Sequence, residues 1–171
     1  MKRMVLFMLL AVAMSLTAAA QKFALVDMEY ILKNIPAYER ANEQLNQVSK
    51  KWQAEVEALN NQAQSLYKNY QNELVFLSAE QKKQREQAIL DKEKEASDLK
   101  KKYFAPEGEL YRKRESLIGP IQDEIYLAVK GIAEQRGLSL VLDRASDNGI
   151  VFASPTADIS NEVLAKLGYS K

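Results

Sequence analysis

The residues that most often carry out enzymatic chemistry are missing from this sequence. It contains no His and no Cys, which excludes Ser-His and Cys-His nucleophile pairs and zinc sites built from imidazole or thiolate ligands. Ser-Lys and carboxylate pairs remain possible, but Ser, Lys and acidic residues recur along the chain as ordinary helix-surface residues. We therefore predict no catalytic site, no metal site and no cofactor, and we do not expect an enzyme.

The side chains that remain as candidates for binding are aromatic or basic. A basic cluster of Lys82, Lys83 and Arg85 is interleaved with Glu80 and Glu86, a pattern typical of a solvated helix face. Apolar residues at helical spacing usually face a partner helix, so packing is the competing interpretation for the aromatic residues. The candidate contacts for a polypeptide ligand are Tyr67, Tyr70, Phe76, Phe104 and Tyr111.

A long helical pair must position these residues. Residues 37–77 contain no Gly or Pro, and their apolar residues recur every three or four positions, which predicts one long helix. Ser78 and Gln81 form a capping-box pattern that begins a return helix. Pro106 with Gly108, and later Gly119-Pro120, are expected to kink or interrupt that return helix.

The two helices have a definite register if the chain reverses near residues 77 and 78, because facing residue numbers then sum to about 155. Toward the tip, Ala63 faces Lys92 and Tyr70 faces Arg85, so the apolar pairing fails. We predict an antiparallel hairpin that is firmly packed at its base and loose at its tip. The apolar pairs at this register are Tyr38–Leu117, Leu45–Leu110, Trp52–Tyr103, Val56–Leu99, Leu59–Ala96 and Leu66–Ile89.

Short apolar segments on both sides of the hairpin predict a small β body. Residues 22–27, 138–143 and 149–153 are strand candidates, and Asn148-Gly149 before the third is a strong hairpin signal. The residues expected to form the strands of this body are Phe23, Leu25, Leu140, Leu142, Ile150 and Phe152.

Several residues predict where helices begin and end. Asp27 is placed to cap a turn after the first strand, Pro36 to begin the long helix, and Gly137 to end the return helix. A final helix is predicted over 160–167, capped by Ser160 and stopped by Gly168.

The first twenty residues have the layout of a secretory signal peptide. Lys2 and Arg3 precede an apolar stretch that is too short to span a membrane, and cleavage is expected after Ala20. Cleavage would change the numbers of basic and acidic residues from 24 and 23 to 22 and 23. A chain so close to neutral has no overall positive potential that would attract nucleic acid. We expect an exported chain with a signal peptide at 1–20, a β-rich body from 21–36 and 119–171, and a hairpin arm at 37–118.

So small a sheet leaves open edges and uncovered apolar surface. Pairing of strands from several copies would cover both. A different partner protein could do the same, but symmetric self-assembly is the commoner solution. We therefore expect a homo-oligomer.

The order of these elements resembles the Skp/OmpH family. The residues that carry the resemblance are Val26-Asp27, Leu140-Val141-Leu142-Asp143 and Asp158-Ile159-Ser160-Asn161-Glu162-Val163-Leu164. The resemblance implies a mainly α fold with a small β body (α+β), assembled as a jellyfish-like trimer whose helical arms surround a cavity.

The resemblance also implies an ATP-independent periplasmic holdase that binds unfolded outer-membrane proteins before their insertion. The best-known members are strongly basic, whereas this chain is nearly neutral, which argues against strong binding of anionic lipid or lipopolysaccharide. A structural or adaptor coiled-coil spacer of the cell envelope is the competing interpretation.

Overall fold

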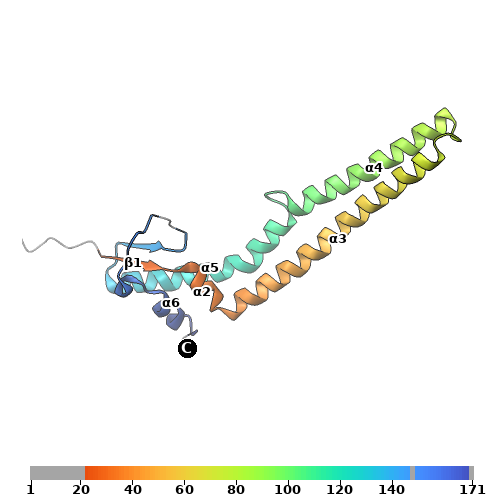
Figure 1. The fold of residues 1–171 in the computed structure, drawn as a ribbon. Coiled ribbons are helices and arrows are strands. Elements are labelled where there is room, and N and C mark those ends of the chain that lie inside the picture. Colours follow the sequence, from red (N-terminus) through yellow and green to blue (C-terminus); the bar gives the residue numbers. More distant parts are fainter. Residues whose placement is uncertain (1–21, 147–148, 170–171) are drawn as a thin grey trace, which may run out of the picture. The chain divides into compact units, whose positions relative to one another are not determined.

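The computed structural model describes residues 22–146 and 149–169, so the expected signal peptide and Asn148 of the predicted turn lie outside the described residues. The chain is mainly helical with a two-stranded sheet, the fold class predicted from its sequence. Its elements are β1 (Phe23–Val26), α2 (Met28–Lys33), α3 (Pro36–Glu73), α4 (Ala79–Phe104), α5 (Glu109–Arg136), β2 (Leu140–Asp143), the short 3-10 helix η2 (Pro155–Ala157) and α6 (Ser160–Lys166) (Figure 1).

These elements divide into two compact units. One unit is Lys33–Glu124, which we call the arm, and the other consists of the described residues of Met1–Leu32 and Ile125–Lys171, which we call the body. Within the described part of the chain, no helix combines the length and the apolar character that crossing a membrane requires.

The arm is built on the pairing of α3 with α4, which run antiparallel and side by side (Figure 1). The rings of Trp52 and Tyr103 stack with their centroids 4.5 Å apart and their planes 6° from parallel. Because these two numbers sum to 155, the stack confirms the predicted register. Further buried residues continue this interface between α3 and α4, which we call the seam, toward the tip. They are Val56, Ala63, Ile89 and Ala96.

The chain reverses between Glu73 and Ala79, so α3 ends four residues before the predicted position 77. The amide of Phe76 donates to the carbonyl of Glu73 at 2.9 Å and closes a turn. Ser78 then begins α4 with both bonds of the predicted capping box: its hydroxyl accepts from the Gln81 amide, and its amide donates to the Gln81 side chain. The capping box is confirmed. The helix ends earlier because the reversal itself needs non-helical residues.

The return helix is interrupted at Pro106 and Gly108, as predicted, but it is not interrupted at Gly119-Pro120. A side chain at position 108 would come within 2.9 Å of two backbone carbonyl oxygens, so the turn between α4 and α5 needs glycine there. At Pro120 the helix α5 continues without a break. An internal proline forfeits a helix hydrogen bond, and the burial of Ile118 and Ile121 on either side of it offsets that loss.

The body is centred on β1, which is buried from Ala24 to Val26. β1 pairs in parallel with β2, so that Phe23 lies opposite Leu140 and Leu25 opposite Leu142. On the other edge of β1, the amide of Ile159 donates to the carbonyl of Leu25 at 2.9 Å. Ile31, Ile125, Ile132 and Val163 are the largest fully buried side chains.

The predicted third strand at 149–153, with Ile150 and Phe152, is wrong. The described residues of this segment form no strand, and Val151 and Phe152 are 100% and 85% exposed. A strand forms only by pairing with another, and the described residues of 149–153 pair neither with β1, whose two edges meet β2 and the segment at Asp158, nor with the outer edge of β2.

Four predicted helix boundaries are confirmed. The Asp27 carboxylate accepts from the Tyr30 amide at 2.8 Å and caps α2, and Pro36 lies at the first turn of α3. Gly137 and Gly168 follow the ends of α5 and α6 with φ of +64° and +84°, a left-handed conformation that favours glycine.

The predicted cap of the last helix is wrong. Helix α6 begins at Ser160, and its N-cap residue, Ile159, supplies no side-chain cap; the Asp158 carboxylate accepts from the Ser160 amide at 2.8 Å. The Ser160 hydroxyl is bonded instead to residues outside the helix, Asp27 and Asp158.

The register can be tested with two introduced cysteines, because the natural chain has none. Trp52→Cys with Tyr103→Cys should give an intramolecular link with a short bismaleimide, identified by peptide mass mapping. Trp52→Cys with Ala96→Cys is the matched control, since seven helical residues displace the second thiol by about 10 Å along the seam. Equal linking of both pairs would contradict the register.

Candidate functional site

The reversal between α3 and α4 exposes apolar side chains at the tip of the arm. Val75 and Phe76 are 82% and 84% exposed, and Tyr67 and Leu90 are also exposed. Exposed apolar residues are ordinary when isolated, but several at the same end of a helix pair form a surface on which another polypeptide can pack. Phe76 and Tyr67 are thus predicted contact residues that the structure leaves accessible.

Polar pairs join the two helices close to this surface. The Tyr70 hydroxyl donates to the Glu86 carboxylate, and Arg85 forms an ion pair with Glu73 at 3.1 Å. The hydrogen bond to Glu86, together with partial burial, raises the pKa of Tyr70. Apolar pairing fails at Tyr70 and Arg85, as predicted, and polar contacts join the two helices there instead.

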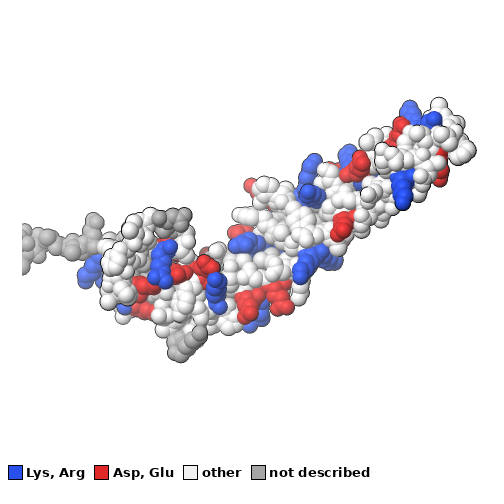
Figure 2. Space-filling view, in the orientation of Figure 1, with Lys and Arg blue, Asp and Glu red and all other residues white. Residues whose placement is uncertain are grey.

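The basic cluster does not form a separate positive patch. Arg85 is already paired with Glu73, while Lys82 and Lys83 form no ion pair in the described parts of the chain. Figure 2 shows basic and acidic side chains interleaved along the arm. This arrangement is that of a solvated helix face, as the sequence pattern indicated.

Farther from the tip, the arm contains a cavity of about 370 Å³. Its walls come from α3, from the end of α4 and from the start of α5, and Leu45 and Leu110, which were predicted to face one another, both line it. The residues lining the cavity are Asn42, Leu45, Asn46, Ser49, Phe104, Ala105, Leu110, Tyr111 and Arg114.

An aromatic series connects this cavity with the seam. Phe104, in the cavity wall, meets the Tyr103 ring edge-to-face at 6.2 Å, and Tyr103 stacks on Trp52. The Tyr103 hydroxyl donates to the Glu55 carboxylate at 2.6 Å. That hydrogen bond is the main reason, ahead of partial burial, that the pKa of Tyr103 is raised.

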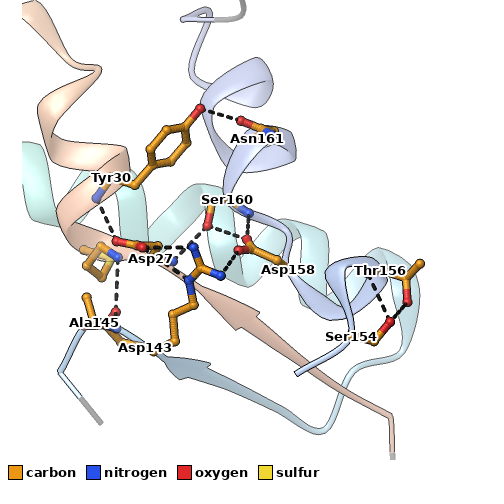
Figure 3. A network of polar contacts seen from close by, with 11 residues as sticks. Asp27, Tyr30, Asp143, Ala145, Ser154, Thr156, Asp158, Ser160 and Asn161 are labelled. Atoms are coloured by element: carbon orange, nitrogen blue, oxygen red, sulfur yellow. Dashed lines mark hydrogen bonds and ion pairs between the residues drawn. The ribbon is translucent and has the colours of Figure 1, made fainter. Parts of the chain in front are cut away.

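In the body, Arg144 joins two carboxylates from different parts of the chain (Figure 3). Its guanidinium lies 3.2 Å from Asp27, at the end of β1, and 3.1 Å from Asp158. The buried Ser160 hydroxyl accepts from the Asp27 amide at 2.8 Å and donates to Asp158 at 2.6 Å. Asp143, the last residue of β2, accepts from the Met28 amide at 3.1 Å. These contacts hold the strand ends and α6 together.

The body also exposes apolar side chains. Phe23 and Leu140 are exposed although they face one another across the β1–β2 pair. The others are Tyr30, Tyr126, Leu127, Val151 and Phe152. Among the described residues, no group of three or more potential metal ligands lies together.

Two features of the site were not anticipated from the sequence. The first is the exposure of Val75. It is adjacent to Phe76 in the sequence, and two neighbouring apolar residues between two helices could have indicated an exposed apolar surface at the reversal. Arg144 carried no comparable signal, because its partners are separated from it in the sequence by 117 and by 14 positions, and only the fold brings them together.

Comparison with known proteins agrees with this architecture. The model of the family described as "Outer membrane protein (OmpH-like)" matches residues 22–167. The chain belongs to this OmpH-like family. It is 26% identical over 160 residues to "Chaperone protein Skp" from Yersinia enterocolitica, covering 92% of this chain and 93% of that protein.

A solved structure of a candidate outer membrane chaperone (OmpH-like) from Caulobacter crescentus has the same fold. The TM-score is 0.65 at 13% sequence identity, over 87% of this chain and 85% of that one. Membership of the Skp/OmpH-like family supports a chaperone role for this OmpH-like chain.

Ser160→Ala tests whether the polar contacts stabilise the body. The substitution leaves the Asp27 amide without its acceptor in a part-buried position, so we expect the free energy of unfolding to fall by about 1–3 kcal/mol. Urea unfolding at one fixed protein concentration measures it. Ser139→Ala removes an exposed hydroxyl of the body and should change stability by less than about 0.5 kcal/mol. Equal effects would contradict the role of Ser160.

Tyr70 and Tyr103 should ionise above about pH 10, the ordinary value for tyrosine. Their hydrogen bonds contribute stability below the unfolded pKa, and that contribution is lost as the pH rises through the raised folded pKa. The difference in 295 nm absorbance between the natural chain and Tyr103→Phe, or Tyr70→Phe, isolates each titration. A titration at or below that of a free tyrosine peptide would contradict the two hydrogen bonds.

Proposed function

We propose that this protein is an ATP-independent holdase of the periplasm, which binds unfolded outer-membrane proteins and prevents their aggregation before insertion. The observation that carries the proposal is the apolar surface at the arm tip, where Val75 and Phe76 are 82% and 84% exposed. A reversal that was covered by other residues of the arm would have buried Val75 and Phe76. Their exposure supports transient packing against another polypeptide.

The chemistry of the proposed client explains why such a surface is useful. Strands of an outer-membrane barrel alternate apolar and polar residues, and before insertion their apolar faces and unpaired edges associate with one another. Contacts with Tyr67, Phe76 and Leu90 would compete with that association. Each contact is weak and is not selective for sequence, so many clients can be held and released at equilibrium without nucleotide.

Self-association of the body is the second part of the proposal. Phe23, Leu140, Val151 and Phe152 are exposed, and the segment containing Val151 and Phe152 has no strand partner within the described part of one chain. Pairing with the edge of another copy would bury these residues and complete their hydrogen bonds. We infer a homotrimer whose arms, residues 37–118, surround the client.

Export completes the proposal. The signal-peptide layout of residues 1–20, with cleavage after Ala20, would deliver the chain to the compartment that unfolded outer-membrane proteins cross.

One observation favours the alternative of a cell-envelope spacer. The Tyr70–Glu86 and Arg85–Glu73 contacts continue the helix pairing almost to the tip, which would stiffen the arm. A spacer nevertheless gains nothing from an exposed Phe76, whereas a holdase needs such a surface.

Aggregation of a client tests the proposal. A urea-unfolded outer-membrane barrel protein is diluted into buffer without nucleotide, with and without the purified chain, and light scattering is followed. The natural chain should suppress scattering. Val75→Ser with Phe76→Ser should raise the amount needed by a factor of about 3 to 10, since it removes part of the apolar burial.

The matched control is Tyr70→Phe, which keeps the ring at the tip and removes only the hydroxyl bonded to Glu86. It should suppress scattering like the natural chain. Undiminished scattering at a molar excess of the natural chain would reject the holdase and leave the spacer.

A further inference from the structure

We propose that the cavity between α3 and α5 is a binding site for the carboxyl-terminal residue of a polypeptide whose last side chain is large and apolar. The inference rests on the proposed function in one respect, that unfolded chains are what the arm meets. It adds a defined site and a chemical feature of the ligand to the diffuse surface at the tip.

The inner part of the cavity suits an apolar side chain. Leu45 and Leu110 face it from opposite helices, and the Phe104 and Tyr111 rings complete its wall. Its volume of about 370 Å³ lies in the range of pockets that enclose small organic groups. An aromatic or branched aliphatic side chain placed there would exchange water for four apolar partners.

The rim carries one positive charge. Arg114 lines the cavity, and neither an ion pair nor a side-chain hydrogen bond is found for it among residues 22–146 and 149–169. A guanidinium binds a carboxylate through two parallel hydrogen bonds, the strongest geometry available to it. An anion is therefore the group that the rim selects.

An apolar wall together with a positively charged rim matches the carboxyl-terminal residue of a polypeptide. Within a polypeptide, the side chains of Asp and Glu carry a charge without a large apolar group, and apolar residues carry no charge. Only the last residue of a chain presents an apolar side chain and a carboxylate on the same carbon atom.

The amide groups on α3 favour a peptide over a fatty acid. Asn42 and Asn46 line the same cavity, and the described part of the chain gives their side chains no hydrogen-bond partner. Both amides can donate to and accept from the peptide groups that precede a chain end. A fatty acid has no such groups to offer.

The natural chain contains its own probe. Trp52 is its only tryptophan, and it stacks on Tyr103, whose ring meets Phe104 in the cavity wall. A ligand that packs against Phe104 should therefore change the Trp52 fluorescence.

The experiment titrates the full mature chain with three tryptophan-free peptides. Acetyl-Gly-Ser-Gly-Ser-Phe with a free carboxyl end should bind, and the same peptide with a terminal amide should bind about tenfold more weakly, because a charge-assisted bond is lost. The third peptide, which ends in Gly with a free carboxylate, should also bind at least about tenfold more weakly, because the apolar contact is lost.

Variants assign the site. Arg114→Gln should weaken the free-acid peptide about tenfold and abolish its advantage over the amide. Arg112→Gln, which removes an exposed cation of the same helix outside the cavity, is the matched control and should bind like the natural chain. Ser49→Phe, which places a ring in the cavity, should block the peptide while leaving Arg114 intact.

Three results would overturn the proposal: equal binding of acid and amide, equal effects of Arg114→Gln and Arg112→Gln, or decanoate binding that is tighter than any peptide. The last would make the site one for lipid carboxylates. A chain that suppresses client aggregation but binds no peptide would refute this site alone, whereas a chain that does neither would refute the proposed function as well.

Discussion

The structure depends on the narrow seam between two antiparallel helices. Each helix of the arm has one apolar stripe and one partner, so contacts such as the Trp52–Tyr103 stack must hold the register without a surrounding core. Everything off the seam stays in contact with solvent. Phe76 is exposed because it lies at the reversal beyond the paired helices, and the cavity beside Leu45 is walled by the start of α5 as well as by α3 and the end of α4.

The body holds its elements together in a different way. It buries β1 between β2 and the segment before α6, and Arg144 with Ser160 ties these pieces together through polar contacts. A body of this size cannot bury all of its apolar residues, and Phe23 and Phe152 remain exposed. The arm and the body thus each leave apolar surface uncovered, and the proposed function assigns the surface of the arm to unfolded clients and that of the body to further copies of the chain.

Local rules explain which parts of the structure were predictable. Helical periodicity, the capping box at Ser78 and the left-handed position of Gly137 act over a few residues, so the sequence shows them directly. The register followed from the position of the reversal and from apolar matching, and the aromatic stack confirms it.

The features that were missed depend on distant parts of the chain. The segment at Ile150 has a strand pattern, but a strand forms only by pairing, and the described residues of this segment pair with no other strand. Helix α5 continues through Pro120, whose neighbours are buried, and the cavity is lined by residues of α3 and α5 that lie far apart in the sequence. None of these is encoded in a short window of residues.

The central claim is that clients are held by the arm, and site-specific photo-crosslinking tests it most directly. Benzoylphenylalanine would replace Phe76 or Tyr111 in the arm, or the exposed Gln135 in the body, before a urea-unfolded barrel protein is added and irradiated. Strong crosslinks to the client from positions 76 and 111, with little from 135, are the predicted result. Crosslinks from 135 alone, or equal crosslinks from all three positions, would contradict binding by the arm.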